Sequence, residues 1–485
     1  METELKNLTI KKFQELLKED KISSREIVNV CFDNINKKNK GINALLEVFD
    51  DAFKEAEKED QRIKSGQTPK PLSGVPFAIK DNIMMEGRIV SAASRILANH
   101  RASYDATAIK KLREAGAIFL GRANMDEFAM GSSSENSAFG PVKNPYDLTR
   151  VAGGSSGGPA AALASDMCLA GLGSDTGGSI RTPAAFCGVV GLKPTYGAVS
   201  RSGLVAMASS LDQIGPIAKT IEDAEIIFNV IKGKDPADST TVEYRGSTSA
   251  AGATRGRTSF TIGIPKEYFS LSGKNKGLDE GIIDKFKTSI EKLKKLGHQI
   301  KEVSLPHTEY VLSCYYIIVP AEISANLARF DGVKYGLYKE GKNLFEDYLK
   351  TRGAGFGKEV RRRIILGTYV LSAGYYEAYY QRAQKVRVLI KEDFKKVFSP
   401  PAGGVDILLT PVSPTPAFKI GEKTDDPVKM YLADIFTVSA NLAGLPALSL
   451  PNGFVELEGT KLPSALQLIS PWFEEEKLFY LGKQL

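Results

Sequence analysis

The chain has 485 residues, of which 42% are hydrophobic and 25% are charged, a balance that excludes collagen-like and disordered low-complexity chains and fits a globular enzyme. The 64 lysine and arginine residues exceed the 57 acidic residues by a net charge of +7, which is too small a surplus for this length to indicate a nucleic-acid-binding protein by itself. Four cysteines without a CxxC pair exclude a disulfide framework and a zinc site of cysteine pairs, so we expect reduced thiols and no bound metal.

The N-terminal sixty residues are predicted to be helical. The first seven residues have no apolar signal core, and we find no run of about 18 apolar residues, the length of a membrane span. Residues 23–26 (Ser-Ser-Arg-Glu) form a capping box, which predicts the start of a helix with Ile27, Cys31 and Ile35 on its buried face. We therefore expect a soluble cytoplasmic protein with no membrane contact.

A βαβ unit is predicted to follow. Residues 77–79 form a short apolar run that begins after Pro76 and ends at Lys80, which is typical of a strand that places a lysine at its end. Residues 105–116 have the periodicity of a helix, and residues 117–120 read as the next strand. A helix between two strands indicates a largely parallel sheet.

Two glycine- and serine-rich clusters lie between residues 131 and 215. The first, Gly-Gly-Ser-Ser-Gly-Gly at 153–158, precedes an alanine-rich segment that suits a helix start. The second, at 173–181, follows an apolar run and ends in Gly-Gly-Ser-Ile-Arg. Successive backbone N–H groups from Thr176 to Ser179 can form a nest for an oxyanion or for a phosphate. No GxxxxGK[ST] or GxGxxG motif occurs, which favours a tetrahedral acyl intermediate over a nucleotide.

A serine nucleophile needs a base, and two kinds are available. Residues 153–157 match GxSxG, the nucleophile elbow of α/β-hydrolases, but that mechanism needs a later histidine. Only His298 and His307 follow, and both are expected on the solvent-exposed surface. The other possible base is a buried lysine, whose pKa falls when its charge is desolvated. Composition alone does not identify which lysine acts as the base.

The remaining chain is predicted to contain a loop and several helices. Residues 245–258 are small and polar without periodicity, so we expect a flexible surface loop. Residues 277–297 have the pattern of an amphipathic, lysine-rich helix, and residues 359–397 have that of one or two long helices.

Several motifs together resemble the amidase signature family. They are Lys80-Asp81-Asn82, the cluster at 153–158, Ser-Asp-Thr-Gly-Gly-Ser-Ile-Arg at 174–181 and Gly-Leu-Lys-Pro-Thr-Tyr-Gly at 191–197. The resemblance covers nearly the whole chain. It implies an α/β fold with a large mixed β-sheet flanked by helices on both faces. It also implies one amidase domain over 1–485, with a signature core at about 70–220 and the segment 221–485 completing the sheet and the substrate pocket.

The resemblance also implies a Ser–Ser–Lys triad. Ser179 is then the nucleophile, Ser155 the proton bridge beside a cis peptide bond, and Lys80 the general base. The backbone N–H groups of Thr176, Gly177, Gly178 and Ser179 are implied to form the oxyanion hole. This agrees with the lysine-base mechanism and disfavours the nucleophile elbow.

The C-terminal half resembles the glutaminase subunits of tRNA-dependent amidotransferases. The similar segments include Gly355–Arg363, Met430–Asp434 and Asn441–Pro446. By that resemblance, Arg363 binds the α-carboxylate of glutamine, Asp434 binds its α-ammonium, and Tyr315 contributes nearby. For Arg363 a solvent-exposed helix position is the alternative.

The same resemblance implies a set of partners. Two other subunits are expected to complete a heterotrimer that uses the released ammonia to convert Glu-tRNA(Gln) to Gln-tRNA(Gln) or Asp-tRNA(Asn) to Asn-tRNA(Asn), with tRNA held mainly by the partner. No Walker motif occurs, so no cofactor is expected in this chain, and ATP and Mg²⁺ are expected at the partner subunit. The alternatives are a stand-alone amidase of small or fatty amides and a non-catalytic scaffold protein.

Overall fold

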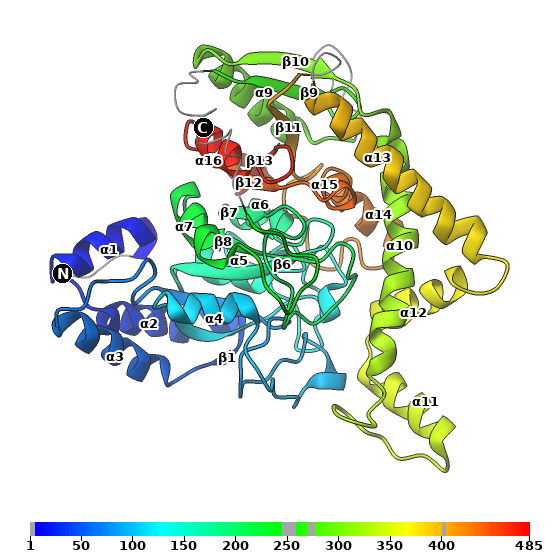
Figure 1. The fold of residues 1–485 in the computed structure, drawn as a ribbon, viewed down its shortest axis with the longest axis horizontal. Helices are drawn as coiled ribbons and strands as arrows, with labels where there is room; N and C mark the ends of the chain where they lie inside the picture. Colours follow the sequence, from blue (N-terminus) through cyan, green and yellow to red (C-terminus); the bar gives the residue numbers. More distant parts are fainter. Residues whose placement is uncertain (1–4, 245–258, 270–276, 400–403) are drawn as a thin grey trace.

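One mixed sheet runs through the protein. The computed structural model describes residues 5–244, 259–269, 277–399 and 404–485, so the loop predicted at 245–258 lies outside the described residues (Figure 1). Within these ranges eleven strands form the sheet. In spatial order they are β1 (Leu45–Val48), β3 (Ile118–Ala123), β2 (Pro76–Lys80), β6 (Ala170–Asp175), β8 (Gln213–Ala218), β7 (Val190–Lys193), β12 (Ala447–Leu457), β13 (Thr460–Ile469), β11 (Ile407–Pro411), β9 (Thr261–Pro265) and β10 (Gln299–Val303). The predicted α/β fold with a large mixed sheet is confirmed.

The helices that cover this sheet come from the whole length of the chain. They are α1 (Ile10–Lys18), α2 (Ser24–Ile42), α3 (Ala52–Lys64), α4 (Thr107–Glu114), α5 (Gly157–Ala164), α6 (Arg181–Cys187), α7 (Ile221–Ile231), α9 (Glu280–Lys295), α10 (Val311–Asn326), α11 (Leu344–Gly355), α12 (Lys358–Val370), α13 (Arg382–Phe398), α14 (Pro427–Tyr431), α15 (Val438–Ala443) and α16 (Glu475–Gly482). The capping box at the start of α2 and the helices predicted near 105–116, 277–297 and 359–397 are confirmed, the last as two helices. A separate antiparallel pair is formed by β4 (Lys143–Asn144) and β5 (Asp147–Val151).

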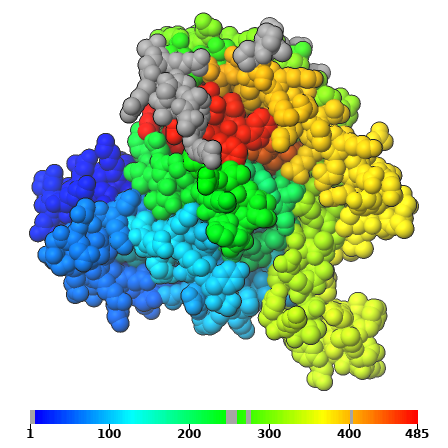
Figure 2. Space-filling model, in the orientation of Figure 1, coloured from blue at the N-terminus to red at the C-terminus, as the bar shows by residue number. Residues whose placement is uncertain are grey.

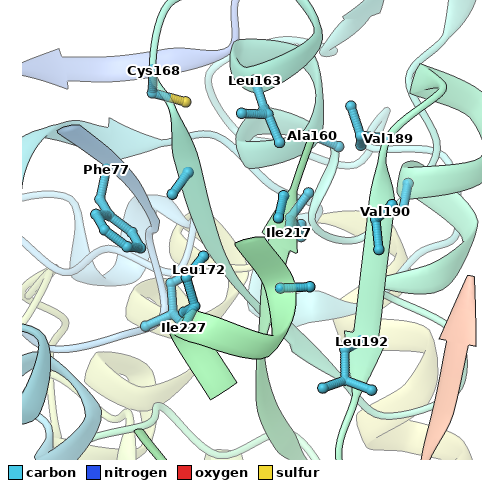
Figure 3. Packing of buried hydrophobic residues seen from close by; sticks show 14 of the residues in the cluster. Phe77, Ala160, Leu163, Cys168, Leu172, Val189, Val190, Leu192, Ile217 and Ile227 are labelled. Atoms are coloured by element: carbon cyan, nitrogen blue, oxygen red, sulfur yellow. The ribbon is translucent and has the colours of Figure 1, made fainter. Parts of the chain in front are cut away.

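Neighbouring residues of β6 show that helices lie on both faces of the sheet. A Cβ atom placed on Gly171 would lie 3.2 Å from the Cβ of Pro159 in α5. The next side chain, Leu172, lies beside Ile227 of α7 (Figure 3). Because successive residues of a strand point to opposite faces, α5 and α7 cover opposite sides of the sheet.

The parallel part of the sheet brings two strand ends together. Strand β2 pairs in parallel with both β3 and β6, with Phe77 opposite Ala170 and Ile79 opposite Leu172, and α4 connects β2 to β3. The predicted βαβ unit is therefore confirmed. Since parallel strands end at the same edge, Lys80 at the end of β2 lies next to the end of β6 at Asp175.

Three helices of the C-terminal half pack together at one side of the sheet. Helices α10, α12 and α13 form this layer, seen on the right of Figure 1. The helical stretch Pro306–Arg329, which contains α10, has the length and mean hydropathy (1.4) of a membrane span, but 50% of its most apolar window is buried inside the protein. Helices α10 and α12 lie close together at Gly367, where a Cβ atom would collide with the carbonyl oxygen of Pro320. The backbones therefore touch at this point.

Gly367→Ala is expected to lower the midpoint of thermal unfolding, because the added methyl group must push α12 away from α10. Overpacking of this kind costs about 1–3 kcal/mol. The matched control is Gly353→Ala in α11, where a Cβ atom meets nothing within 4 Å and the alanine favours the helix. Calorimetry of both variants checks the prediction, and equal or higher midpoints for both would contradict the close packing at Gly367.

Candidate active site

A fully buried lysine lies at the centre of the candidate site. Lys80 has no exposed surface. Its Nζ atom lies 2.8 Å from Ser155 Oγ and 2.8 Å from Ser156 Oγ. It also lies 2.9 Å from Ser174 Oγ and 3.1 Å from the Ser174 carbonyl oxygen. Two oxygen atoms from the segment before α5 and two from Ser174 in strand β6 thus surround one amine.

Burial changes the ionisation of this amine. Desolvation lowers the pKa of Lys80 to about 7, although the carboxylates of Asp126, Asp175 and Asp212 act in the opposite direction. Near neutral pH a large fraction of Lys80 is therefore uncharged and able to accept a proton. A neutral amine offers a lone pair to one of the hydroxyl groups around it, and Ser155 is one of these.

The two glycine-rich clusters bring Ser155 and Ser179 to the same place. The peptide bond between Gly154 and Ser155 is cis, as the family resemblance implies. The Ser156 N–H donates to the carbonyl oxygen of Ser179 at 3.0 Å. Ser179 is 7% exposed, and its hydroxyl forms no hydrogen bond with any residue that the structure describes. The structure thus joins Lys80 to Ser155 directly and holds the Ser179 backbone against Ser156, with the Ser179 hydroxyl unengaged among the described residues.

A buried ion pair shapes the loop that carries Ser179. Arg181 and Asp175 are both fully buried, with Nη2 to Oδ1 at 3.0 Å and Nε to Oδ2 at 3.1 Å. The same carboxylate accepts the N–H groups of Gly178 at 2.9 Å and Ile180 at 3.0 Å. Burial alone would raise the pKa of Asp175, but the charge of Arg181 holds that pKa well below its usual range. The loop therefore folds around a permanent carboxylate.

This arrangement leaves most of the proposed oxyanion donors free. The Gly178 N–H is engaged by Asp175. Among the residues described by the structure, the N–H groups of Thr176, Gly177 and Ser179 have no acceptor. Three of the four donors expected from the resemblance are thus available to a ligand, while the roles themselves stay predictions.

Arg363 differs from the two arginines before it. It is 4% exposed, whereas Arg361 and Arg362 are exposed, so the alternative of a solvent-exposed position is wrong for Arg363. Its Nε donates to Glu359 Oε1 at 2.7 Å. Its guanidinium carbon lies 5.5 Å from the ring centroid of Tyr316 and 5.6 Å from that of Tyr431. An oriented cation is thus held inside the protein.

Asp434 supplies an anion in the same region. It is 6% exposed, and its Oδ2 accepts a hydrogen bond from Ser132 Oγ at 2.5 Å and one from the Tyr316 hydroxyl at 3.4 Å. Burial raises the pKa of Asp434 to about 7, although Ser132 and Arg363 act in the opposite direction. Tyr316 contacts both side chains: its ring lies against the Arg363 guanidinium and its hydroxyl donates to Asp434.

Tyr315 connects this region to the nucleophile loop. It is buried, and a Cβ atom on Gly177 would lie 2.6 Å from the Tyr315 hydroxyl oxygen. The side chain therefore covers the loop, which explains why a glycine is needed there. A cavity of about 260 Å³ opens beside Arg363, and neither Tyr315 nor Gly177 is among its lining residues. Among its lining residues are Ser133, Lys358, Glu359, Arg363, Lys423 and Tyr431.

Sequence reasoning missed several partners of these residues. Ser174 beside Lys80, Ser132 beside Asp434 and Glu359 beside Arg363 carry no pattern that reveals which side chain they contact. Ser174 and Glu359 lie inside recognised motifs, whereas Ser132 lies outside them.

The two histidines required by a nucleophile elbow bond elsewhere. His298 is 4% exposed, so the prediction that it lies on the surface is wrong. Its Nδ1 accepts a hydrogen bond from the Phe260 N–H, and its Nε2 lies 2.9 Å from Gln484 Oε1. His307 pairs with Asp393 at 2.9 Å. Neither histidine lies against a candidate catalytic serine. Over the described ranges, no group of three His, Cys, Asp or Glu side chains is arranged to hold a metal ion.

Comparison with known proteins gives a consistent result. The sequence profile of the amidase family matches residues 26–479. The chain is 53% identical over 477 residues to the glutamyl-tRNA(Gln) amidotransferase A-subunit of Carboxydothermus hydrogenoformans, a match that covers 98% of this chain and 96% of that protein. The crystal structure of the Thermotoga maritima protein of the same name is 42% identical, with a TM-score of 0.78 over 99% of this chain and 94% of that one. Native peptide amidase from Stenotrophomonas maltophilia is 26% identical, with a TM-score of 0.79 over 99% of this chain and 96% of that one.

The buried amine of Lys80 is expected to make stability depend on pH. Its pKa is about 7 in the folded protein against 10.5 for a free lysine, so the unfolded chain binds more protons between these values. The free energy of unfolding of the wild type, relative to Lys80→Met, should therefore rise by about 2 kcal/mol from pH 7 to pH 9.

Urea unfolding at several pH values measures this difference. The control is Lys58→Met, which removes an exposed lysine and should show no such pH dependence relative to the wild type. A difference between wild type and Lys80→Met that stays constant from pH 7 to pH 9 would mean that Lys80 keeps an ordinary pKa.

Proposed function

Because the chain belongs to the amidase family, we propose that it hydrolyses a carboxamide through Ser179, with Ser155 and Lys80 moving the proton. The observation that carries the proposal is the buried Nζ of Lys80 at 2.8 Å from Ser155 Oγ, with a pKa lowered to about 7. A serine hydroxyl needs such a base to attack an amide near neutral pH.

The proposed reaction has two halves. In the first, neutral Lys80 takes the proton of Ser155 while Ser155 takes that of Ser179, whose hydroxyl must turn toward Ser155 when substrate binds. Ser179 Oγ then attacks the carbonyl carbon, and the free N–H groups of Thr176 and Gly177 stabilise the oxyanion. The relay returns the proton to the departing nitrogen, which leaves as ammonia. In the second half, water attacks the acyl-enzyme through the same relay and releases the acid.

The substrate that we propose is glutamine. A free amino acid presents a carboxylate and an ammonium, and the site holds a buried cation, Arg363, near a buried anion, Asp434. Arginine suits the carboxylate because its fork donates two parallel hydrogen bonds. Glu359 accepts from the Nε of Arg363, and the two terminal Nη groups form no hydrogen bond with any residue that the structure describes, so they remain available to the carboxylate. Tyr315, which lies against Gly177, then marks the end of the pocket where the carboxamide meets the nucleophile loop.

The proposal places this chain within a larger enzyme. It acts as the glutaminase component of a tRNA-dependent amidotransferase, as the names of its relatives at about 50% identity support. Two partner subunits would then complete a heterotrimer in the cytoplasm. The partner would use ATP and Mg²⁺ to activate the carboxylate of Glu-tRNA(Gln), or of Asp-tRNA(Asn), and would hold most of the tRNA. A stand-alone amidase is less favoured because an apolar amide has no use for the buried charges of Arg363 and Asp434.

Replacing the nucleophile or the base is expected to stop ammonia release from glutamine. Ser179→Ala and Lys80→Ala should each lower kcat/KM by at least about 10³-fold, because the relay acts as a unit. The exposed-serine variant Ser65→Ala serves as the control and should keep wild-type activity. In the wild type, kcat/KM should rise with pH through about 7 as Lys80 loses its proton. A coupled glutamate assay over pH 5.5–9 reads all of these, and wild-type rates in Lys80→Ala would exclude the mechanism.

The pocket charges are expected to control affinity more than rate. Arg363→Lys should raise the KM for glutamine about 10–100-fold, because a lysine loses the bidentate contact to the carboxylate. The control Arg361→Lys changes an exposed arginine on the same helix and should leave KM unchanged. Asp434→Asn should also raise KM and should remove any rise in wild-type KM below pH 7, where Asp434 takes up a proton. Unchanged KM values in both pocket variants would assign the glutamine site elsewhere.

A further inference from the structure

A cluster of exposed apolar side chains lies at the outer end of the α12–α13 pair. We call it the tyrosine patch, and it consists of Ile365, Leu366, Tyr369, Leu371, Tyr375 and Tyr379. Figure 2 shows this part of the chain, in yellow, protruding from the side of the molecule. Tyr375 and Tyr379 belong to the turn and the short π-helix (Tyr376–Gln381) between the two helices.

The patch is contiguous and large. The ring centroids of Tyr369 and Tyr375 lie 4.3 Å apart, and that of Tyr379 lies 6.2 Å from Tyr369. Ile365 is one helical turn before Tyr369 on the same face of α12. Exposed fractions run from 37% for Leu371 to 68% for Ile365. Large side chains at these fractions expose on the order of 500 Å², as much as the largest patch of a typical monomer and a large part of one partner's share of a stable interface.

The rim of the patch is cationic. Four exposed cations, Arg361, Arg362, Arg382 and Lys385, lie on the two helices that carry it, against one exposed acidic residue, Glu377, in the π-helix; Arg362 also pairs with Glu359. A second copy of this chain docking on a two-fold axis would bring these like charges together. RNA would match the charges but not the aliphatic side chains of Ile365 and Leu366, which form part of the centre. A protein with apolar sockets surrounded by carboxylates matches both features.

We infer that the tyrosine patch is the docking surface for the ammonia-consuming partner, a protein that presents an apolar socket with an acidic rim. The inference rests on the proposed function, since relatives of this chain are named as one component of a multi-subunit enzyme. Protein–protein interfaces are enriched in tyrosine at their centre and are polar at their rim, which is the arrangement of this patch. The inner face of α12 carries Arg363, so the docked partner contacts the helix that binds glutamine.

The double variant Ile365→Asp/Tyr369→Asp tests the surface. The two partner subunits of the same organism, co-expressed and purified without this chain, serve as the probe in a titration by interferometry. The double variant should bind them at least about 30-fold more weakly than the wild type, because two central anchors are lost and the acidic rim is repelled. The control Phe345→Asp changes a side chain on α11 that is 70% exposed and should bind as the wild type does.

Partner-free glutaminase activity and thermal midpoints show whether the variant is folded. Ile365 and Tyr369 have no place in the catalytic or binding machinery, so both readouts should equal those of the wild type. If the wild type releases no ammonia from glutamine, the proposed function fails whatever the binding result. If the wild type is active and the double variant binds the partners equally well, the surface assignment alone is overturned. Loss of tRNA binding by the isolated variant in a gel shift, or dimerisation of the wild type that the variant abolishes, would also overturn it.

Discussion

The uncharged state of Lys80 is the constraint on which the site depends. An amine removed from water must give up its charge or find oxygen atoms to accept its hydrogens, and Lys80 does both in part. It has four oxygen contacts from Ser155, Ser156 and Ser174, while burial brings its pKa to about 7. The parallel pairing of β2 with β6 makes the Ser174 contacts possible, because it brings the end of β2 against the end of β6.

A second buried charge fixes the loop that faces the lysine. The Asp175 carboxylate is paired with Arg181 and organises the loop through the N–H groups of Gly178 and Ile180. Arg181 is in turn held by the carbonyl oxygen of Thr437 at 3.0 Å and by Gln467. Such pairs are costly to break because a lone buried charge remains. The loop therefore depends on residues from the C-terminal half. The signature core at 70–220 is held in shape by contacts with that half.

Sequence reasoning predicted the parts of this protein that are local in the chain. The strand ending at Lys80, the capping box of α2 and the βαβ unit follow from periodicity and turn residues within short windows. The family resemblance supplied Ser155, Ser179, Arg363 and Asp434 as candidates. Sequence patterns could not show that the side-chain amide of Asn82 donates to the Ser174 hydroxyl beside Lys80. Nor could they show that Ser132 donates to Asp434, 302 residues away. These contacts arise from the order of strands in the sheet, which no short window contains. The buried position of His298 was missed for the same reason, since its partner Gln484 is distant in sequence.

The titration of Lys80 in the folded protein tests the account most directly. Full-length protein with ¹³Cε-labelled lysine, compared with Lys80→Arg to assign the signal, reports the ionisation of this one amine by NMR. A midpoint at about pH 7 is expected. A midpoint at about 10.5, the value of a solvated lysine, would contradict it, because a charged amine cannot take the proton of Ser155.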